Sequence, residues 1–408
     1  MNSAVQRTTQ RRTRLIALAT GLVLLLSGCS VIETVTGVPL QGDGANGAEV
    51  VIVTDAASST AAGADATATP KLAAKATATP DTTPTPTPIN EGISPTTGRP
   101  LPESAVYRPV LVAIDNAAQA RPQTALMLAD IVYEFPLDRE DHNTRYLALF
   151  SDTLPERVGP VRTSRSYMAD TALEWGGLYV SLGDPELATA DYPKLADSGI
   201  QNHVENTGEA ASFFYRDKTI TAIEEHTNFF QLLSYVEAHS DFSPDYSTTR
   251  FVFQSGITYE KGKEIRSVGI PFTSSDSERV LFTYDAVKNV LVRSDKNSKK
   301  VLGESKSLTP TDDVLGYSND PVTVQNLIVQ FVRVSSLDGT FRSIEVTGKG
   351  ECMYFVNGRA VFGSWSRPTL ADTTSYLLYD GTPLKLEPGN TWIMMMPSKQ
   401  DLKIRYAG

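Results

Sequence analysis

Cysteine and histidine are scarce in this chain, which has two cysteines and four histidines among its 408 residues. No two histidines stand at the spacing of a metal-binding pair, and the cysteines, Cys29 and Cys352, lie far apart in sequence. The chain also lacks the phosphate-binding loop GxxxxGK[ST] and the Gly-x-Ser-x-Gly elbow of serine hydrolases. The sequence therefore predicts no metal site and no cofactor.

The N-terminus carries an apolar run, Leu15–Leu26, that is too short to span a bilayer, which needs about 20 residues. Four arginines precede this run, and Leu-Ser-Gly-Cys, ending at Cys29, closes it in a pattern that resembles the bacterial lipobox. This order is typical of a lipoprotein signal peptide over residues 1–28. We predict that Cys29 is acylated, for example with palmitate, and anchors the chain to the cell membrane on its extracytoplasmic face.

Residues 29–93 are rich in Ala, Thr, Pro and Gly and end in Thr-Pro repeats. Such a segment has too few bulky apolar side chains to fold, and its prolines favour an extended backbone. We therefore predict a disordered tether between the lipid and a folded body. With Cys29 acylated, Cys352 has no partner for an intrachain disulfide, and we expect it to be a buried, inert thiol.

About 310 residues follow the tether, and their sequence pattern changes near Ser240, which predicts two domains, 94–245 and 246–408. In the first domain, short apolar runs alternate with amphipathic segments. This alternation predicts an α/β fold (α+β possible) with a mixed, partly parallel sheet, whose binding sites lie at the carboxyl ends of strands. The expected strands are 109–115, 131–135, 144–150 and 178–183, and the expected helices are 121–130, 164–176 (capped by Thr163 or Ser164), 184–199 and 226–239.

The second domain, 246–408, consists mostly of short runs of β-branched and aromatic residues separated by turn residues. Asn357-Gly358 and Asp380-Gly381 carry the sequence signal of tight hairpin turns. We therefore predict a mostly-β C-terminal half.

Several stretches carry more specific information than their hydrophobic pattern. They are SPTTGRPL (Ser94–Leu101), ARPQTALMLADIVYE, GPVRTSR, GKGECMYFVNGRAVFGSW and LEPGNTWIMMMP. Together they resemble the YerB-like family of bacterial lipoproteins, whose function is unknown, and they cover most of residues 94–397 in the same order. The resemblance implies a cell-envelope location, a fold of two parts and no established activity.

Arg157, Arg162 and Arg165 lie within nine residues of one another. Three neighbouring guanidinium groups repel one another unless negative charge lies among them, and the planar guanidinium suits carboxylate or phosphate. The net charge of −10 becomes about −14 once the four signal-peptide arginines are removed, which excludes nucleic acid as a partner. We predict a cleft for an anionic cell-wall or peptide ligand. Its candidate residues are Asp115, Asn116, Arg121, Arg162, Arg165, Arg216, Asp217 and His226.

Three alternatives to this cleft remain open. Each arginine could form an internal ion pair, such as Arg162 with Asp115, and Asp115 could instead cap a helix. The protein could be a cell-envelope hydrolase that uses His226 or a carboxylate pair. It could also be a scaffold that binds another envelope protein. The hydrolase sets are Ser181 with His226 and Asp217, Asp115 with Glu134, and Asp138 with Asp141. We favour a binding or regulatory protein over an enzyme.

Overall fold

The structure is a computed structural model that describes residues 92–102, 107–117, 120, 123–137, 144–184, 202–216, 225–239, 251–271, 280–295, 321–336, 341–397 and 402–407. All of them belong to one compact unit of the chain. The predicted signal peptide, Cys29, the tether and nearly all of the expected helix 184–199 lie outside the described residues. In the described part of the chain, no helix is long and apolar enough to cross a membrane.

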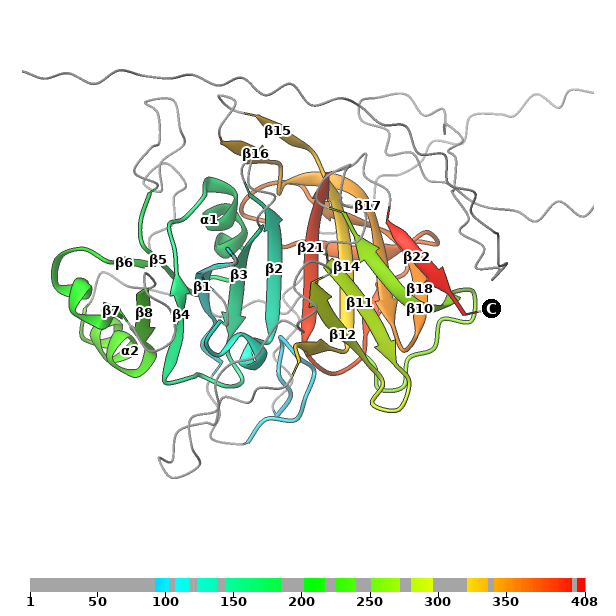
Figure 1. Cartoon of the computed structure of the whole chain (residues 1–408), viewed down its shortest axis with the longest axis horizontal. Coiled ribbons are helices and arrows are strands. Elements are labelled where there is room, and N and C mark those ends of the chain that lie inside the picture. The colour runs from blue at the N-terminus through cyan, green and yellow to red at the C-terminus, as the bar shows by residue number, and fades with distance from the viewer. Residues whose placement is uncertain are drawn as a thin grey trace, which may run out of the picture. The chain divides into compact units, whose positions relative to one another are not determined.

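A mixed sheet forms around β1 (Val110–Asp115) in the N-terminal half, as Figure 1 shows. On one side, β1 pairs antiparallel with β3 (Thr144–Phe150), which pairs antiparallel with β2 (Ile131–Pro136). On the other side, β1 pairs parallel with β5 (Leu178–Ser181), which pairs parallel with β6 (His203–Glu205). The prediction of a partly parallel sheet is therefore confirmed.

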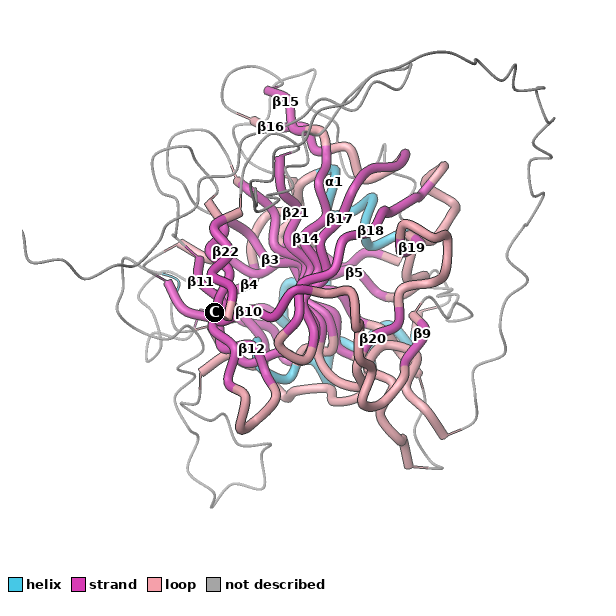
Figure 2. The backbone as a smooth tube through the Cα atoms, turned by 90° about the vertical axis from the view of Figure 1, so that its right-hand side faces the viewer, coloured by secondary structure: helices cyan, strands magenta, loops and turns pink. Residues whose placement is uncertain are grey.

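The same sheet continues into the C-terminal half, because β2 pairs parallel with β21 (Thr391–Pro397). Beyond β21 the sheet adds β14 (Asn326–Val332), β17 (Gly348–Val356), β18 (Arg359–Arg367) and β19 (Ser375–Leu378). Figure 2 shows these strands crossing one behind another with the usual progressive twist. The predicted domain division near residue 245 stays a prediction, while the sheet runs through both halves.

Both faces of this sheet are covered, which explains why β1 is buried at all six positions. Val110, Val112 and Ile114 belong to one hydrophobic cluster, while Leu111 and Ala113 belong to a second cluster on the opposite face. A further part of the same sheet, joined to it where β10 (Lys263–Ile270) pairs with β18, contributes to the first cluster. It contains β10, β11 (Val280–Asp285), β12 (Val290–Asp295), β13 (Thr323–Val324) and β22 (Lys403–Tyr406).

The second cluster is covered by α1 (Ser166–Leu173), which contributes Met168, Ala169 and Ala172 to it. Smaller elements surround this core. They are η2 (Leu126–Leu128), η4 (Gly208–Phe213), α2 (Phe229–Ala238), the ladder of β4 (Arg157–Val161), β8 (Glu225–Asn228) and β7 (Phe214–Arg216), and the pairs β9 (Val252–Phe253) with β20 (Lys385–Leu386) and β15 (Val334–Ser336) with β16 (Arg342–Ile344).

The hairpin prediction at Asn357-Gly358 is confirmed. These two residues join β17 to β18, and both have positive φ values, 47° for Asn357 and 73° for Gly358. That conformation is the one that Asn-Gly adopts in a tight hairpin turn. The C-terminal half is mostly β, as the sequence predicted.

Three local predictions about helices are wrong. Residues 123–130 form only the short 3₁₀ turn η2, because Thr124 pairs through its backbone with Gly159 instead of continuing a helix. The helix expected from His226 begins at Phe229, because the preceding residues pair as β8 with β4 and β7. The cap of α1 is Arg165 without a side-chain hydrogen bond, since Ser164 Oγ lies 2.6 Å from the Tyr179 hydroxyl instead.

Candidate functional site

The arginine segment 161–165 lies at the carboxyl ends of β1 and β5. The Arg162 N–H donates to the Ala113 carbonyl at 2.8 Å, and the Leu182 N–H donates to the Arg162 carbonyl at 3.0 Å. One step along, the Ser164 N–H donates to the Gly183 carbonyl at 2.8 Å. These hydrogen bonds place the segment at the edge where ligand sites of α/β sheets usually form.

Arg162 is fixed at one end of its guanidinium group and open at the other. Its Nε lies 3.2 Å from Oδ2 of Asp115, whose side chain is 7% exposed, whereas the Arg162 side chain is 46% exposed. Within the described residues, Nη1 and Nη2 of Arg162 have no hydrogen-bond partner. The alternative pairing of Arg162 with Asp115 is thus confirmed, and it leaves a fork of two nitrogens directed away from Asp115.

Arg145 and Arg165 lie behind Arg162 and are buried. Arg145 stands opposite Asp115 in the β1–β3 register, and its Nη1 donates to the carbonyl oxygen of Thr163 at 2.8 Å. Nη1 of Arg165 donates to the Oγ1 of the same threonine at 3.2 Å, and the Arg165 guanidinium lies 5.4 Å from the centre of the Phe341 ring. One threonine therefore joins two buried cations.

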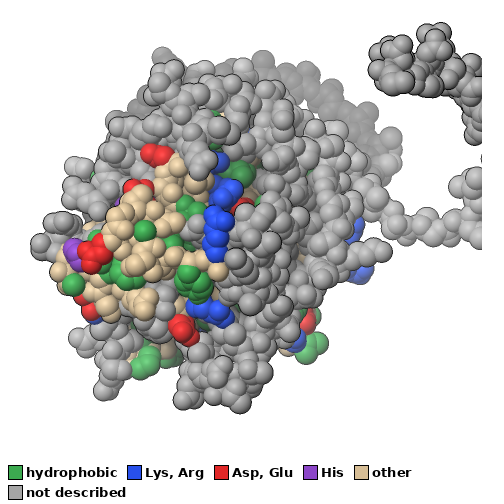
Figure 3. All heavy atoms as spheres, turned by 60° about the vertical axis from the view of Figure 1, so that its left-hand side comes forward, with side chains coloured by type: hydrophobic (Ala, Val, Ile, Leu, Met, Phe, Trp, Pro, Cys, Tyr) green, Lys and Arg blue, Asp and Glu red, His purple; other side chains and the backbone are tan. Residues whose placement is uncertain are grey.

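This crowding of cations shows in the pKa of Arg145. Burial, and next the positive charge of Arg165, lower the pKa of Arg145 to about 10; Arg162 acts in the same direction, and Asp115 and Tyr167 oppose them. Asp115 is the carboxylate that acts on Arg145 here, against two neighbouring guanidinium groups. Figure 3 shows Lys and Arg side chains gathered in a stripe on the face of the N-terminal half.

The side chain of Asn116 is held by buried hydrogen bonds to neighbouring side chains. Its Nδ2 donates to Thr144 Oγ1 at 2.7 Å, and its Oδ1 accepts from Gln123 Nε2 at 3.0 Å. Thr144 in turn donates to Glu134 Oε1 at 2.6 Å, and Glu134 is fully buried and paired with Arg293. The hypothesis that Asp115 and Glu134 form a catalytic carboxylate pair is therefore wrong, because Glu134 is closed to solvent and neutralised.

The other predicted site residues are placed less completely. Arg121 and Asp217 lie outside the described residues, as do Asp138 and Asp141, and only the backbone of His226 is described. Arg216 is exposed at the end of β7, and the β7–β8–β4 ladder aligns it with Glu225 and then Val161. Two strand spacings, about 10 Å, separate the backbone of Arg216 from the arginine segment. The structure thus brings together Asp115, Asn116, Arg162 and Arg165.

Ser181 has a different partner from the one hypothesised. Its Oγ lies 3.0 Å from Nε2 of His203 on the neighbouring strand, and it accepts the Gly183 N–H at 3.0 Å. Burial lowers the pKa of His203 to about 4, so this histidine is neutral at physiological pH. Ser181 is completely buried. A buried hydroxyl offers no route to a substrate, so the set of Ser181 with His226 does not form a hydrolase site.

Arg145 is the site residue that the sequence-based selection missed. In the sequence, Arg145 is the single charged residue of the apolar run 144–150. The structure buries this run at every position. A charged side chain in such a run must find polar partners, and strands buried on both faces rarely contain one.

Comparisons with known proteins agree with this fold. Residues 96–243 match the model of the N-terminal domain of "Protein of unknown function (DUF3048)", and residues 268–393 match the model of its C-terminal domain. The chain is 27% identical over 305 residues to the Bacillus subtilis (strain 168) protein named "Putative lipoprotein YerB", across 71% of this chain and 81% of that protein. The crystal structure of YerB from Bacillus subtilis superposes with a TM-score of 0.57 at 23% identity, covering 75% of this chain and 96% of that one. With both domains matched in order, the chain belongs to the DUF3048 family, the YerB-like proteins of unknown function.

Proposed function

We propose that this protein is a lipid-anchored binding protein of the cell envelope, and that Arg162 and its neighbours bind an anionic group of an envelope ligand. One observation carries the proposal. Asp115 holds Arg162 through Nε, which fixes the guanidinium plane while leaving Nη1 and Nη2 unbonded within the described residues. A planar fork that is already oriented loses little conformational entropy when a carboxylate or phosphate binds to it.

The charge around Arg162 supports the same proposal. Arg145 and Arg165 are buried, and the charges of Arg165 and Arg162 both act to lower the pKa of Arg145. An anion beside Arg162 would lower the repulsion among them. A carboxylate of a peptide and a phosphate of a wall polymer share this chemistry.

The lipid anchor rests on two supports. The sequence from the N-terminal arginines to Cys29 has the order of a lipoprotein signal peptide. The Bacillus subtilis relative carries the word lipoprotein in its name. Acyl chains on Cys29 would hold the site at the outer surface of the cell membrane, where the ligand would be a component of the envelope.

The test is calorimetric and thermal-shift titration of the full chain, purified in detergent at low ionic strength. The probes are inorganic phosphate, glycerol phosphate and the dipeptide D-alanyl-D-alanine, which separate phosphate from carboxylate ligands. Arg162→Gln removes the fork, and Arg162→Lys keeps the charge without it. Hydrogen bonds to charged groups contribute about 1.5–3 kcal/mol, so we expect Kd to rise at least about tenfold in Arg162→Gln.

Arg333→Gln is the matched control. Arg333 has a side chain that is 48% exposed, pairs with Glu345 at 3.0 Å, and lies outside the arginine segment 161–165. Its replacement should leave anion binding unchanged. The proposal fails when none of the three probes binds saturably to the wild type, or when Arg162→Gln binds them as tightly as Arg333→Gln does.

A further inference from the structure

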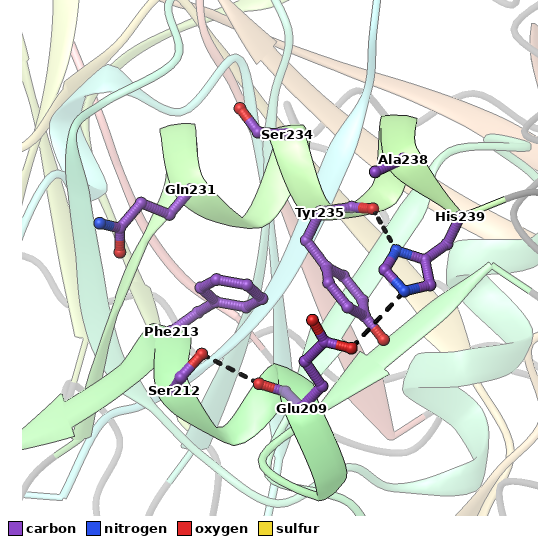
Figure 4. Close-up of a pocket in the computed structure, with 8 residues that line it drawn as sticks. All are labelled: Glu209, Ser212, Phe213, Gln231, Ser234, Tyr235, Ala238 and His239. Atoms are coloured by element: carbon purple, nitrogen blue, oxygen red, sulfur yellow. Dashed lines mark hydrogen bonds and ion pairs between the residues drawn. The ribbon is translucent and has the colours of Figure 1, made fainter.

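An open, shallow hollow lies away from the arginine segment, between η4 and α2. It has a volume of about 680 Å³ and is lined by Glu209, Ser212, Phe213, Gln231, Ser234, Tyr235, Ala238 and His239. Figure 4 shows that α2 supplies one wall and η4 the opposite wall, with the rings of Phe213 and Tyr235 between them. No residue of the hollow belongs to the proposed anion site.

Three rings form a row along this hollow. The centres of the Phe213 and Tyr235 rings are 5.2 Å apart, and those of the Tyr235 and His239 rings are 4.0 Å apart. Phe213 and Tyr235 are only partly buried, and both pack against the hydrophobic core on their inner side. The ligand side of the hollow therefore offers an apolar surface of ring carbons, on which another flat apolar face can pack.

Hydrogen-bond acceptors face each other at one end of the hollow. His239 Nδ1 lies 2.7 Å from the Tyr235 carbonyl oxygen, so Nδ1 carries the proton and donates it. In the neutral ring Nε2 is then an acceptor, and it lies 3.7 Å from the Glu209 carboxylate, which also accepts. A ligand that donates hydrogen bonds from more than one hydroxyl would satisfy both acceptors, which Figure 4 shows beside each other.

The remaining polar groups of the lining are uncharged. They are the hydroxyls of Ser212 and Ser234 and the amide of Gln231, which both donate and accept. The exposed carboxylate of Glu209 disfavours an anionic ligand. A cationic ligand is disfavoured as well, because the row of rings does not surround a cation as an aromatic cage does.

We infer that the hollow between η4 and α2 binds a neutral sugar unit of a β-linked hexopyranose glycan. Such a ring has an apolar face of axial C–H groups, which packs on the rings of Phe213 and Tyr235. Its equatorial hydroxyls donate to Glu209 and His239 and exchange hydrogen bonds with the serines and Gln231. This site is independent of the proposed anion site in its residues and in the charge of its ligand.

The experiment is saturation-transfer NMR and calorimetry on the full chain in detergent, with two neutral probes, chitotetraose and cellotetraose. A single shallow site of this kind predicts a Kd on the order of 1 mM. Ser234→Arg fills the hollow from an exposed position of α2 without touching the core, and Tyr235→Ala removes the central ring. We expect both variants to bind at least about tenfold more weakly.

Two control variants show whether the sugar binds in this hollow or elsewhere on the protein. Ser255→Arg introduces the same side chain at an exposed turn elsewhere and should leave glycan binding unchanged. Arg162→Gln should also leave it unchanged, so a failure of the anion site is distinguishable from a failure of this one. Absence of saturable binding of both tetrasaccharides up to about 20 mM overturns the inference. So does binding that survives Ser234→Arg, or binding of tetramethylammonium in place of the sugars.

Discussion

Glu134 and Arg293 form a completely buried ion pair between the two halves of the protein. Arg293 Nη2 lies 2.8 Å from Oε1 and 2.9 Å from Oε2 of Glu134, and both side chains are 0% exposed. The carboxylate also accepts from Thr144 Oγ1 at 2.6 Å and from Trp392 Nε1 at 2.9 Å. Because Oε1 accepts from Thr144 and Arg293 and Oε2 accepts from Arg293 and Trp392, replacement of Glu134 disturbs strands of both halves.

The loss of stability in Glu134→Gln can be estimated from the buried charge of Arg293 that remains after the change. The guanidinium of Arg293 stays enclosed by the rings of Tyr146, Phe282 and Trp392, with centroid distances between 4.9 and 5.9 Å. Removing one partner of a buried pair typically costs about 3–5 kcal/mol, because the other charge is left uncompensated. At about 2–4 °C per kcal/mol for domains of this size, we expect the melting temperature to fall by roughly 10 °C.

A double-mutant cycle tests the reasoning. Urea unfolding at pH 7 gives the free energy of unfolding for wild type, Glu134→Gln, Arg293→Met and the double variant. We expect the double variant to be more stable than Glu134→Gln alone, because it contains no uncompensated charge, and the rings around residue 293 pack on the methionine side chain. Two results would refute the argument: a loss below about 1 kcal/mol in Glu134→Gln, or additive losses in the double variant.

Three further predictions concern separate parts of the fold. Burial, and next the charge of Asp152, raise the pKa of Asp130 to about 8, so the folded state keeps a proton that the unfolded state releases near pH 4. The free energy of unfolding should therefore fall between about pH 4 and pH 8 in thermal unfolding, and Asp130→Asn should remove this fall. A Cβ on Gly177 would clash with the Pro109 carbonyl oxygen, so Gly177→Ala should lower the free energy of unfolding in urea by at least about 2 kcal/mol. A Cβ on Gly208 would meet open space, so Gly208→Ala should lower it by only about 1 kcal/mol, through the positive φ at this position. Burial raises the pKa of Cys352 to about 12, so iodoacetamide should label this thiol at pH 8 only after denaturant unfolds the chain.

The strands were predictable because their residues carry the pattern locally. The apolar runs 110–115 and 144–150 are buried on both faces, and Asn357-Gly358 adopts the backbone conformation that this pair favours. The continuity of the sheet was not predictable, because the pairing of β2 with β21 joins residues about 260 positions apart and leaves no local signal. Residues 123–128 had a helical pattern that tertiary hydrogen bonds overrode.

The site was predictable in part for a related reason. Asp115 and Asn116 follow a strand directly, and Arg162 and Arg165 stand out by their density, so all four could be selected from composition and position. The partner of Ser181 could not, since His203 reaches it from an adjacent parallel strand across 22 residues. The roles also required the structure. Asn116 is joined to Glu134 through Thr144, while Arg162 is directed toward solvent.

The arginine cluster makes little sense as a device for stability alone. An ion pair with one exposed partner, such as Arg162 with Asp115, contributes about 0–1 kcal/mol, and burial followed by the charge of Arg165 lowers the pKa of Arg145. Elsewhere in the described chain, Glu134 with Arg293 and Glu174 near Arg367 show that this protein places a carboxylate beside a buried arginine. At Arg145, the carboxylate of Asp115 acts against burial and against the charges of Arg165 and Arg162. Unfavourable local charge that is kept in an otherwise consistent fold is typical of functional sites, where a bound ligand compensates for it. We therefore propose that Arg162, which Asp115 contacts through Nε, is the group through which this site would recognise an anion.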